Sequence, residues 1–585
     1  MTDSKQKFTL HEISIYLKNH KNWPLEKQVI QDAEKEIKQY TASEQLEWFA
    51  HHPPLSAAGK IAHVKALIKH KSEHVKSTAQ RYWSNTNFTP QERTAFLTAC
   101  GNYLSEQDHM QRINYLFFTN QQDEIQHILP LVKSNRFRKE IQLRFCIYKG
   151  KITHLQKTQQ NLSDGLRYQW IRFCRINRKD EEAYLWLIQS IKDNPEYAEQ
   201  WWIERNWMAR RFIEYAFLEP KKKTLYLKKA LDVIAHHNLK SGEKYADACF
   251  LQGFLQYKMH SFSAAFKTFS ALYDNVKTPM SKSRAAYWAG ISAVKANNDH
   301  AKSWFEKAAH HPMTFYGQVA TLRLKRNLHV SKPGKGHWPT HNNLAETLKQ
   351  FRPEISSDLI QPFCNATIES SHSFEEAEAF CNFVKKNFNT TCYIRTCKKA
   401  AMKFGKNPMG HDMLPLVKIP KKLTTTPLDR ATIQAIIYRE SECDRFARSE
   451  KGALGFMQLI PKTAKAMARK LGIRIKNEND ILNADNNIKL GFHNIKHVLD
   501  ANKGSYVIGL CCYNTDPCNV RTWLKDYGDP RNKNMNVIEW IECIPFYETR
   551  SYVIRVLENI VNYLVATGYT DIAKQLYKKE RIYGD

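Results

Sequence analysis

Apolar residues recur every three or four positions from residue 1 to about residue 330, which is the period of amphipathic helices. Gly253 and Phe269 recur as Gly290 and Phe305, an offset of about 36 residues, close to the ~34 of tetratricopeptide-type helical hairpins. The glycines would let paired helices approach closely, and the aromatic rings would fill the groove between them. The pattern predicts a solenoid of stacked helical hairpins.

Two stretches rich in Pro and Gly interrupt this pattern, at residues 327–343 and 405–422. We therefore expect an α-superhelical domain in residues 1–330, a small helical linker domain in 331–425 and a C-terminal domain in 426–585. Gly is scarce and turn dipeptides are few, which argues against an all-β sandwich or barrel. The expected fold class is all-α.

The C-terminal domain opens with a helix-start signal, in which Thr426 can cap and Pro427 suits the first turn. The helix predicted to follow covers residues 431–442. It places Glu440 on the same face as three isoleucines, Ile433, Ile436 and Ile437.

A carboxyl group on the apolar face of a helix is costly unless it lines a cleft. Desolvation there raises its pKa, so that Glu440 would stay protonated near neutral pH and could act as an acid. Glu442 falls on the wetter face and is expected to be a surface residue. Periodicity alone leaves a second interpretation open, in which Glu440 caps the helix or pairs internally with a basic neighbour.

Four blocks in this part of the chain have a recognisable order, and together they resemble the lytic transglycosylase domain of the large soluble murein transglycosylases, a goose-type lysozyme-like fold. The blocks are ES at Glu440-Ser441, GALGFMQLIPKTA at 452–464, YN at Tyr513-Asn514 and IPFYETRSYV at 544–553. Upstream, YWAG from Tyr287 and TFYGQVA from Thr314 resemble the superhelical segment of that family more weakly. The resemblance implies a superhelix, a linker domain and a catalytic domain, in agreement with the three parts above.

The chemistry that this resemblance implies is cleavage of the β-1,4 bond between N-acetylmuramic acid and N-acetylglucosamine without water. Glu440 would protonate the glycosidic oxygen and then, as a carboxylate, take the proton from the muramoyl 6-hydroxyl, which closes a 1,6-anhydro ring. One carboxyl suffices because the 2-acetamido group of the substrate stabilises the cation, unlike the schemes with two carboxylates. Neither a cofactor nor a metal ion is implied.

The resemblance also implies a set of substrate-binding residues: Ser441, Ser449, Met457, Gln458, Tyr513, Asn514 and Glu548. Five of the seven have a structural alternative. The two serines would be a helix serine and a turn serine, Met457 a core residue and Tyr513 a buried tyrosine. Glu548 would form a salt bridge to Arg550 or another base.

The chain departs from the family pattern at four positions. Cys443 stands where the family usually has an aromatic residue, and Arg445 where it has a proline. Thr515 and Asp516 replace the Ala and Gly that normally follow the YN block. Asp516 restricts the backbone where glycine is usual and brings an extra carboxylate near the cleft.

The 88 basic and 58 acidic side chains give a net charge of +30, which attracts polyanions such as nucleic acid, acidic lipid or an anionic wall polymer. Thirteen scattered cysteines make a closed disulfide framework unexpected, and most are predicted to be small buried hydrophobic residues. The N-terminus has no apolar run of the secretory type, and no apolar stretch is long enough to span a bilayer. These features favour the cytoplasm, whereas the resemblance implies the periplasm.

The leading hypothesis is a periplasmic peptidoglycan lyase that acts on glycan strands, with cell-wall synthesis proteins as candidate partners. A goose-type muramidase, in which water attacks instead of the 6-hydroxyl, is the enzymatic alternative. A helical-repeat scaffold with a decayed end domain is the non-enzymatic one. A nucleic-acid-binding repeat protein rests on charge alone, and we expect no specific nucleic acid.

Overall fold

The computed structural model describes residues 8–20, 23–152, 163–189, 195–332, 334, 343–350, 357–407, 409–420, 423 and 426–583. It divides into two compact units, residues 1–204 and 205–585. The described residues form α-helices and short 3-10 helices, with isolated β-bridges at Arg448–Leu454 and Leu454–Leu459. The predicted all-α class is confirmed.

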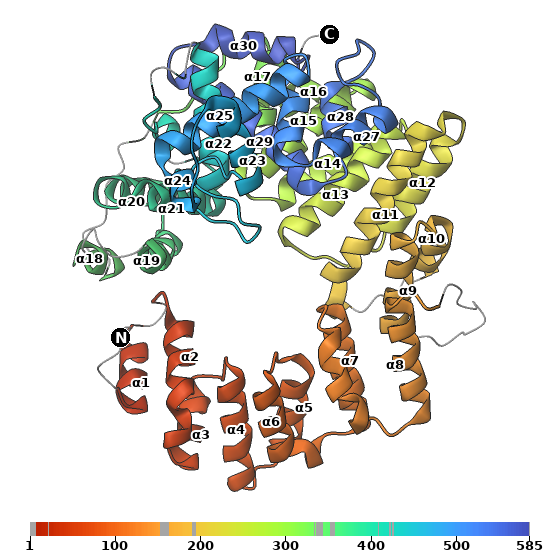
Figure 1. Ribbon diagram of the computed structural model, residues 1–585, viewed down its shortest axis with the longest axis vertical. Helices are drawn as coiled ribbons and strands as arrows, with labels where there is room; N and C mark the ends of the chain where they lie inside the picture. Colours follow the sequence, from red (N-terminus) through yellow and green to blue (C-terminus); the bar gives the residue numbers. More distant parts are fainter. Residues whose placement is uncertain are drawn as a thin grey trace. The chain divides into compact units, whose positions relative to one another are not determined.

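The first unit is a series of short helices from α1 to α8 in which helices two apart pack on each other, α4 on α6 and α5 on α7, so that α6 lies between α4 and α5 in the view of Figure 1. Their starts have a local cause, because Thr9, Thr41 and Thr89 each form a capping box with a glutamate three residues later. The α-helices are α1 Leu10–Asn19, α2 Glu26–Glu36, α3 Ala42–His51, α4 Ala57–Lys69, α5 Val75–Asn85, α6 Pro90–Cys100, α7 Glu106–Phe118, α8 Asn135–Tyr148, α9 Asp164–Ile176 and α10 Asp180–Gln189. The 3-10 helices are η1 Ile37–Gln39, η2 Gly101–Tyr103, η3 Gln122–His127, η4 Leu129–Leu131 and η5 Pro195–Tyr197.

The second unit begins inside helix α11 and continues the helical hairpins. These helices are α11 Ala198–Leu218, α12 Lys223–Ile234, α13 Gly242–Lys258, α14 Phe262–Asn275, α15 Pro279–Lys295, α16 Ala301–Ala309 and α17 Phe315–Arg323, with η6 at Pro220–Lys222. The repeated Gly and Phe have the predicted effect. A Cβ atom at Gly253 would lie 2.7 Å from the Phe269 ring, and one at Gly290 would lie 2.7 Å from the Phe305 ring. Each ring therefore packs against helix backbone that only glycine leaves open.

A small group of helices follows: α18 Asn343–Gln350, α19 Ser357–Ser370, α20 Phe374–Asn387 and α21 Thr390–Phe404. Gly405 ends α21 in a left-handed conformation with φ 68°, which glycine adopts without strain. Beyond it, η7 Gly410–Met413 and an irregular segment lead to residue 420. The predicted connector at 405–422 thus contains no α-helix in its described part, whereas residues 335–342 of the other connector lie outside the described residues.

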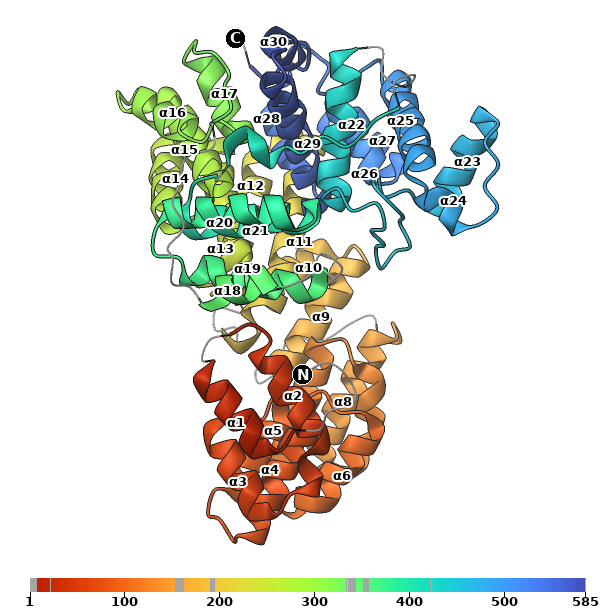
Figure 2. The same ribbon diagram turned by 90° about the vertical axis from the view of Figure 1, so that its left-hand side faces the viewer.

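The last group contains α22 Pro427–Ser441, α23 Pro461–Leu471, α24 Glu478–Leu482, α25 Ala484–Ala501, α26 Tyr506–Asn514, α27 Pro517–Tyr527, α28 Val537–Cys543, α29 Tyr547–Ala566 and α30 Thr570–Lys579. Helix α29 is the centre of this group, because α22, α26, α28 and α30 all pack on it (Figure 2). Helices α23 to α25 form a separate hydrophobic cluster at the side. The predicted boundaries at residues 330 and 425 stay predictions.

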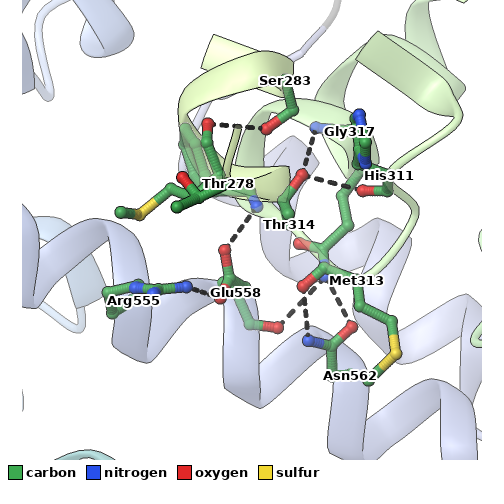
Figure 3. Close-up of polar contacts among 12 residues, drawn as sticks. Thr278, Ser283, His311, Met313, Thr314, Gly317, Arg555, Glu558 and Asn562 are labelled. Atoms are coloured by element: carbon green, nitrogen blue, oxygen red, sulfur yellow. Dashed lines mark hydrogen bonds and ion pairs between the residues drawn. The ribbon is translucent and has the colours of Figure 1, made fainter. Parts of the chain in front are cut away.

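Helix α29 also packs on α17 of the superhelix through buried polar contacts (Figure 3). The Glu558 carboxylate accepts a hydrogen bond of 2.8 Å from the amide of Phe315, the first residue of α17. A negative charge at a helix N-terminus is favourable, because the free amides there carry partial positive charge. Asn562 donates to the Met313 carbonyl at 2.9 Å and accepts from Gln318 at 2.8 Å. The TFYGQVA segment is therefore the surface on which α29 is fixed.

Candidate active site

Helix α22 carries the candidate acid and begins as predicted. The Thr426 side chain accepts from the Asp429 amide at 3.1 Å, and Pro427 occupies the first turn. The helix differs from the prediction in its burial. All eight residues from 431 to 438 are buried, so α22 has no wet face over this stretch and the single apolar stripe inferred from periodicity is wrong. Helix α29 covers one side of it.

Glu440 lies on the last turn of α22 and is half-buried. Burial is the main influence on this group and raises the pKa of Glu440 to about 7. The Tyr552 hydroxyl and the charge of Arg439 act in the opposite direction, and the charge of Glu548 adds to the increase in pKa. No ion pair to Glu440 forms among the described residues, so the internal salt bridge left open by the sequence is not formed there.

Glu442 ends α22 in a left-handed conformation with φ 51°. It is not the freely solvated residue expected from the sequence, because it accepts from Arg395 at 2.7 Å and from Lys398 at 2.6 Å. Both cations belong to α21. Burial acts to raise the pKa of Glu442, but these two cations outweigh it and hold the pKa below its ordinary value. The pKa values of Glu440 and Glu442 are therefore shifted in opposite directions, although the two residues are only two positions apart.

Two tyrosine rings lie beside Glu440. Tyr513 and Tyr552 are stacked, with ring centroids 6.4 Å apart and planes 8° from parallel. The Tyr513 hydroxyl donates to the Met457 carbonyl at 3.0 Å. The Tyr552 side chain is buried, and its hydroxyl forms no hydrogen bond within normal distance and angle limits to any described residue. Burial and the Glu440 charge together raise the pKa of the Tyr552 hydroxyl well above its ordinary value, so it stays protonated.

The loop between α22 and α23 is held by a buried side chain, Asn487 of α25. Its amide donates to the Leu454 carbonyl at 2.9 Å, and its oxygen accepts from the Met457 amide at 2.8 Å. Gly455 is required here, because its φ is +75° and a Cβ atom would lie 2.5 Å from the Asn487 amide nitrogen. Gln458, at φ 46°, donates to the carbonyls of Ala447 and Gly455 at 3.1 and 2.9 Å.

Three of the predicted substrate-binding side chains have structural roles in this geometry. Met457 is fully buried against Gly491, so it is a core residue and only its carbonyl faces Tyr513. Ser441 is buried and donates to the Ile437 carbonyl at 3.1 Å, as serines inside helices commonly do. Ser449 accepts from the Ala453 amide at 3.0 Å and so closes the turn that leads to Gly455.

The remaining predicted residues meet at the N-terminus of α29. Asn514 accepts from the Thr549 hydroxyl at 2.7 Å, which ties the YN block to this helix. Glu548 is exposed on the first turn of α29, close enough for its charge to raise the pKa of Glu440. Arg550 is the sequence alternative as its salt-bridge partner, but its guanidinium instead lies 3.3 Å from the nearest carboxylate oxygen of Asp247.

Two of the four departures from the family pattern, Asp516 and Cys443, lie at helix boundaries. Asp516 has φ −59° and accepts from the Cys518 amide at 2.7 Å, so it caps α27 and needs no left-handed backbone. Cys443 follows Glu442 in the left-handed region with φ 64°.

All thirteen cysteines are free thiols and eight of them are buried, which agrees with the prediction that most are small core residues.

Two residues of the site were missed by the sequence reasoning. Tyr552 lies inside the IPFYETRSYV block, four residues after Glu548, and its helical spacing places both on one face. That spacing was a usable signal. Asn487 lies about 30 residues from the loop that it holds, and nothing in its own neighbourhood marks it.

A cavity of about 220 Å³ lies at the other end of α26, lined by Lys503, Ser505, Val507, Pro530, Arg531, Val537, Lys579, Glu580 and Arg581. It is separate from the residues around Glu440. The Glu580 carboxylate accepts from the Tyr506 and Val507 amides at 2.8 and 3.1 Å. None of the helices in the described part of the chain is both long and apolar enough to cross a membrane.

The fold and the site together define an all-α protein of helical hairpins, whose C-terminal helices hold one half-buried acid beside two stacked tyrosines. Residues 419–536 match the family described as Transglycosylase SLT domain, so the chain carries a domain of this family. The soluble lytic murein transglycosylase of Escherichia coli strain K12 is 32% identical over 124 residues, which are 21% of this chain and 19% of that protein. The one of Salmonella typhimurium is 30% identical over 131 residues, 22% of this chain and 20% of that protein. The match spans about a fifth of these curated relatives.

Solved structures extend the likeness to nearly the whole chain. An inactive variant of the lytic transglycosylase Slt from Pseudomonas aeruginosa has a TM-score of 0.69 and 18% identity, covering 96% of this chain and 90% of that one. The 70 kDa soluble lytic transglycosylase from Escherichia coli has a TM-score of 0.63 and 15% identity, covering 97% and 90%. At this identity the likeness establishes the fold. The chain has the superhelical all-α fold of the soluble lytic transglycosylases.

Proposed function

We propose that this protein is a peptidoglycan lytic transglycosylase. It would cleave the β-1,4 bond between N-acetylmuramic acid and N-acetylglucosamine and leave 1,6-anhydro ends. The observation that carries the proposal is the position of Glu440 in a transglycosylase SLT domain, half-buried at the end of α22 beside the stacked Tyr513 and Tyr552, where burial raises its pKa to about 7. A carboxyl with this pKa is largely protonated at slightly acidic pH and gives up its proton readily, which a general acid requires.

In the first step Glu440 donates its proton to the glycosidic oxygen as the bond from that oxygen to the anomeric carbon breaks. The 2-acetamido group of the muramoyl unit stabilises the positive charge that develops. In the second step the Glu440 carboxylate takes the proton of the 6-hydroxyl, whose oxygen attacks the anomeric carbon. Glu440 ends protonated, as it began. Holding the 6-hydroxyl close makes this attack intramolecular, which lowers the barrier by up to several kcal/mol.

The surrounding residues would divide between binding and positioning. The buried Tyr552 hydroxyl would position Glu440 and favour its carboxylate form, because it acts to lower the pKa of that group. Tyr513 and Asn514 would hold the site wall, through the Met457 carbonyl and Thr549 respectively. Of the predicted set, the exposed Glu548 carboxylate and the side-chain oxygen of Gln458, whose amide nitrogen already donates to two carbonyls, would accept hydrogen bonds from sugar hydroxyls. Ser441 and Ser449 would support the backbone.

Peptidoglycan glycan strands are the proposed substrate, and the periplasm is the compartment in which that substrate is found. The basic surface suits an anionic wall polymer. The solved complex of the 70 kDa soluble lytic transglycosylase with bulgecin A supports a ligand-binding site in this fold.

The test is mass spectrometry of the sugars released from purified sacculi by the wild type and by Glu440→Gln. Anhydro-muramoyl ends in the wild type alone would support the proposal, whereas reducing ends would identify a muramidase. Equal inactivity of both proteins, with both folded, would favour the non-catalytic scaffold. Steeply salt-dependent retention of DNA that ignores Glu440→Gln would favour the nucleic-acid alternative.

A further inference from the structure

A group of aromatic side chains lies on the surface where the superhelix meets the N-terminus of α29. We call Trp207, Phe546 and Tyr547 the aromatic patch. Trp207 comes from α11, and the other two immediately precede Glu548. The Trp207 and Phe546 rings have centroids 6.0 Å apart at 68°. Trp207 is 37% exposed and Tyr547 38% exposed, although such large rings are usually buried.

The patch has a rigid base. Trp523 of α27 is buried and meets the Phe546 ring edge-on, with centroids 5.3 Å apart at 90°. The Tyr547 hydroxyl donates to Glu243 of α13, and the Arg550 guanidinium lies 5.4 Å from the Tyr547 ring centre. These contacts hold Phe546 and Tyr547 in place, while part of Trp207 and of Tyr547 stays exposed. A preorganised surface loses little conformational entropy when a ligand binds.

The patch is continuous with the candidate active site. Glu548 follows Tyr547 directly, and its charge raises the pKa of Glu440. Phe546 lies six residues before Tyr552, which is about 9 Å along a helix axis. A chain of sugars bound at Glu440 and leaving the site past Glu548 would therefore reach the patch within a short oligosaccharide length.

The chemistry of the patch fits a glycan. A pyranose ring has an apolar face of C–H groups, which packs favourably on the electron-rich face of an aromatic ring. The exposed carboxylates of Glu243 and Glu548 border the patch and can accept hydrogen bonds from sugar hydroxyls.

We infer that the aromatic patch is a remote sugar-binding subsite, in which Trp207 of the superhelix stacks on a sugar of the glycan strand beyond those held at Glu440. This inference rests on the proposed function for its choice of ligand. It gives the superhelix a direct part in substrate binding, because one of the three rings belongs to α11. The subsite serves long strands and contributes nothing to the binding of a disaccharide.

The test measures binding without turnover, in proteins that all carry Glu440→Gln. Purified uncross-linked glycan strands and a muramoyl disaccharide are the two probes. We expect Trp207→Ala to weaken binding of the long strands about two- to tenfold and to leave disaccharide binding unchanged, whereas Trp207→Phe keeps most of the affinity. Tyr569→Ala is the matched control, because Tyr569 is also an exposed aromatic residue but follows the far end of α29. If thermal melting shows that Trp207→Ala is unfolded, Trp207→Gln replaces it.

Equal binding of the long strands by the parent and Trp207→Ala would overturn the inference, and so would an equal loss for the disaccharide. Absence of binding to the long strands in the parent itself would also overturn it. Failure of the proposed function is seen separately, as intact sacculi after incubation with wild-type protein. If binding of the strands depends on Trp207 but the protein with Glu440 intact does not cleave them, the result would support the subsite and reject the lyase.

Discussion

The Tyr552 ring lies parallel to the Tyr513 ring, with centroids 6.4 Å apart and planes 8° from parallel. The two tyrosines come from α29 and α26, and the Glu440 charge raises the pKa of both hydroxyls in addition to burial. Glu440 therefore lies beside two neutral tyrosine side chains that come from separate helices. Their hydroxyls differ, because the Tyr513 hydroxyl donates a hydrogen bond to the Met457 carbonyl, whereas the Tyr552 hydroxyl forms no hydrogen bond within normal distance and angle limits to a described residue.

We predict that Glu440 makes the stability of the protein depend on pH. Folded Glu440 keeps its proton to about pH 7, whereas the unfolded chain releases it near its ordinary pKa of 4.5. The folded state binds more protons between these values, so its stability falls as pH rises from 4.5 through 7. Glu440→Gln should remove this loss and stabilise the protein at pH 8 by at most about 3 kcal/mol. Denaturation midpoints of both proteins at pH 4 and pH 8 test this, and a pH-independent difference would contradict it.

The Tyr552 hydroxyl should lower the pKa of Glu440, because its dipole favours the carboxylate. Tyr552→Phe is therefore expected to move the alkaline limb of the pH–activity profile on sacculi to higher pH. Tyr513→Phe is the matched control. It removes a hydroxyl that bonds a carbonyl instead, so it should cost about 1 kcal/mol of stability and leave that limb in place. Movement of the limb in both variants, or in neither, would argue against the role of Tyr552.

The loop around Gly455 offers a comparison of two glycines. Both have positive φ, +75° at Gly455 and +78° at Gly452, but only at Gly455 would a Cβ atom meet Asn487, at 2.5 Å. Gly452→Ala should therefore cost only the left-handed backbone penalty of about 1–2 kcal/mol. Gly455→Ala should cost on the order of 3 kcal/mol and also reduce lysis of sacculi, since it displaces the loop that carries Gln458. Thermal melting and turbidity assays of both variants, compared at equal folded fraction, measure the difference.

Glu542 of α28 is the centre of a buried ionic cluster that joins the last helices to the superhelix. Arg284 donates to it at 2.9 Å, the Tyr316 hydroxyl also donates to it, and the Arg550 side chain lies 3.7 Å away. Glu542→Leu leaves the half-buried Arg284 without its carboxylate partner and the buried Arg550 with Asp247 as its remaining carboxylate, and should cost about 3–5 kcal/mol.

Glu539→Gln is the matched control for this prediction. It breaks a more exposed ion pair of the same helix, with Lys258 at 2.6 Å, and should cost about 1 kcal/mol. Addition of Arg284→Met to Glu542→Leu should restore part of the lost stability, because it removes one of the unpaired charges. A double variant that is less stable than Glu542→Leu alone would contradict the cluster as described.

Signals that act over a few residues were readable before the structure was known. Thr426 caps α22, and Gly253 and Gly290 each leave room for a phenylalanine ring of the next helix to pack against the backbone. Periodicity placed the Glu440 carboxyl on an apolar face, and the order of the four motif blocks then selected it as the candidate acid. The inferred face was nevertheless wrong in detail, since α22 is buried on all sides over 431–438 and a one-sided pattern does not describe such a helix.

The sequence by itself determined the helices and the hairpin repeat, because helix caps, periodicity and small residues act between neighbours along the chain. It singled out Glu440 through the order of the four motif blocks, since periodicity alone left an internal partner for this residue open. Only the tertiary structure decided that Met457 lies in the core, that Glu442 is paired with α21 and that Tyr552 stands beside the acid. It also brought Trp207 to within 6.0 Å of Phe546, more than three hundred residues later. Such pairs depend on how whole helices pack. No local pattern encodes that packing, because the same helical sequence is compatible with many different neighbouring helices.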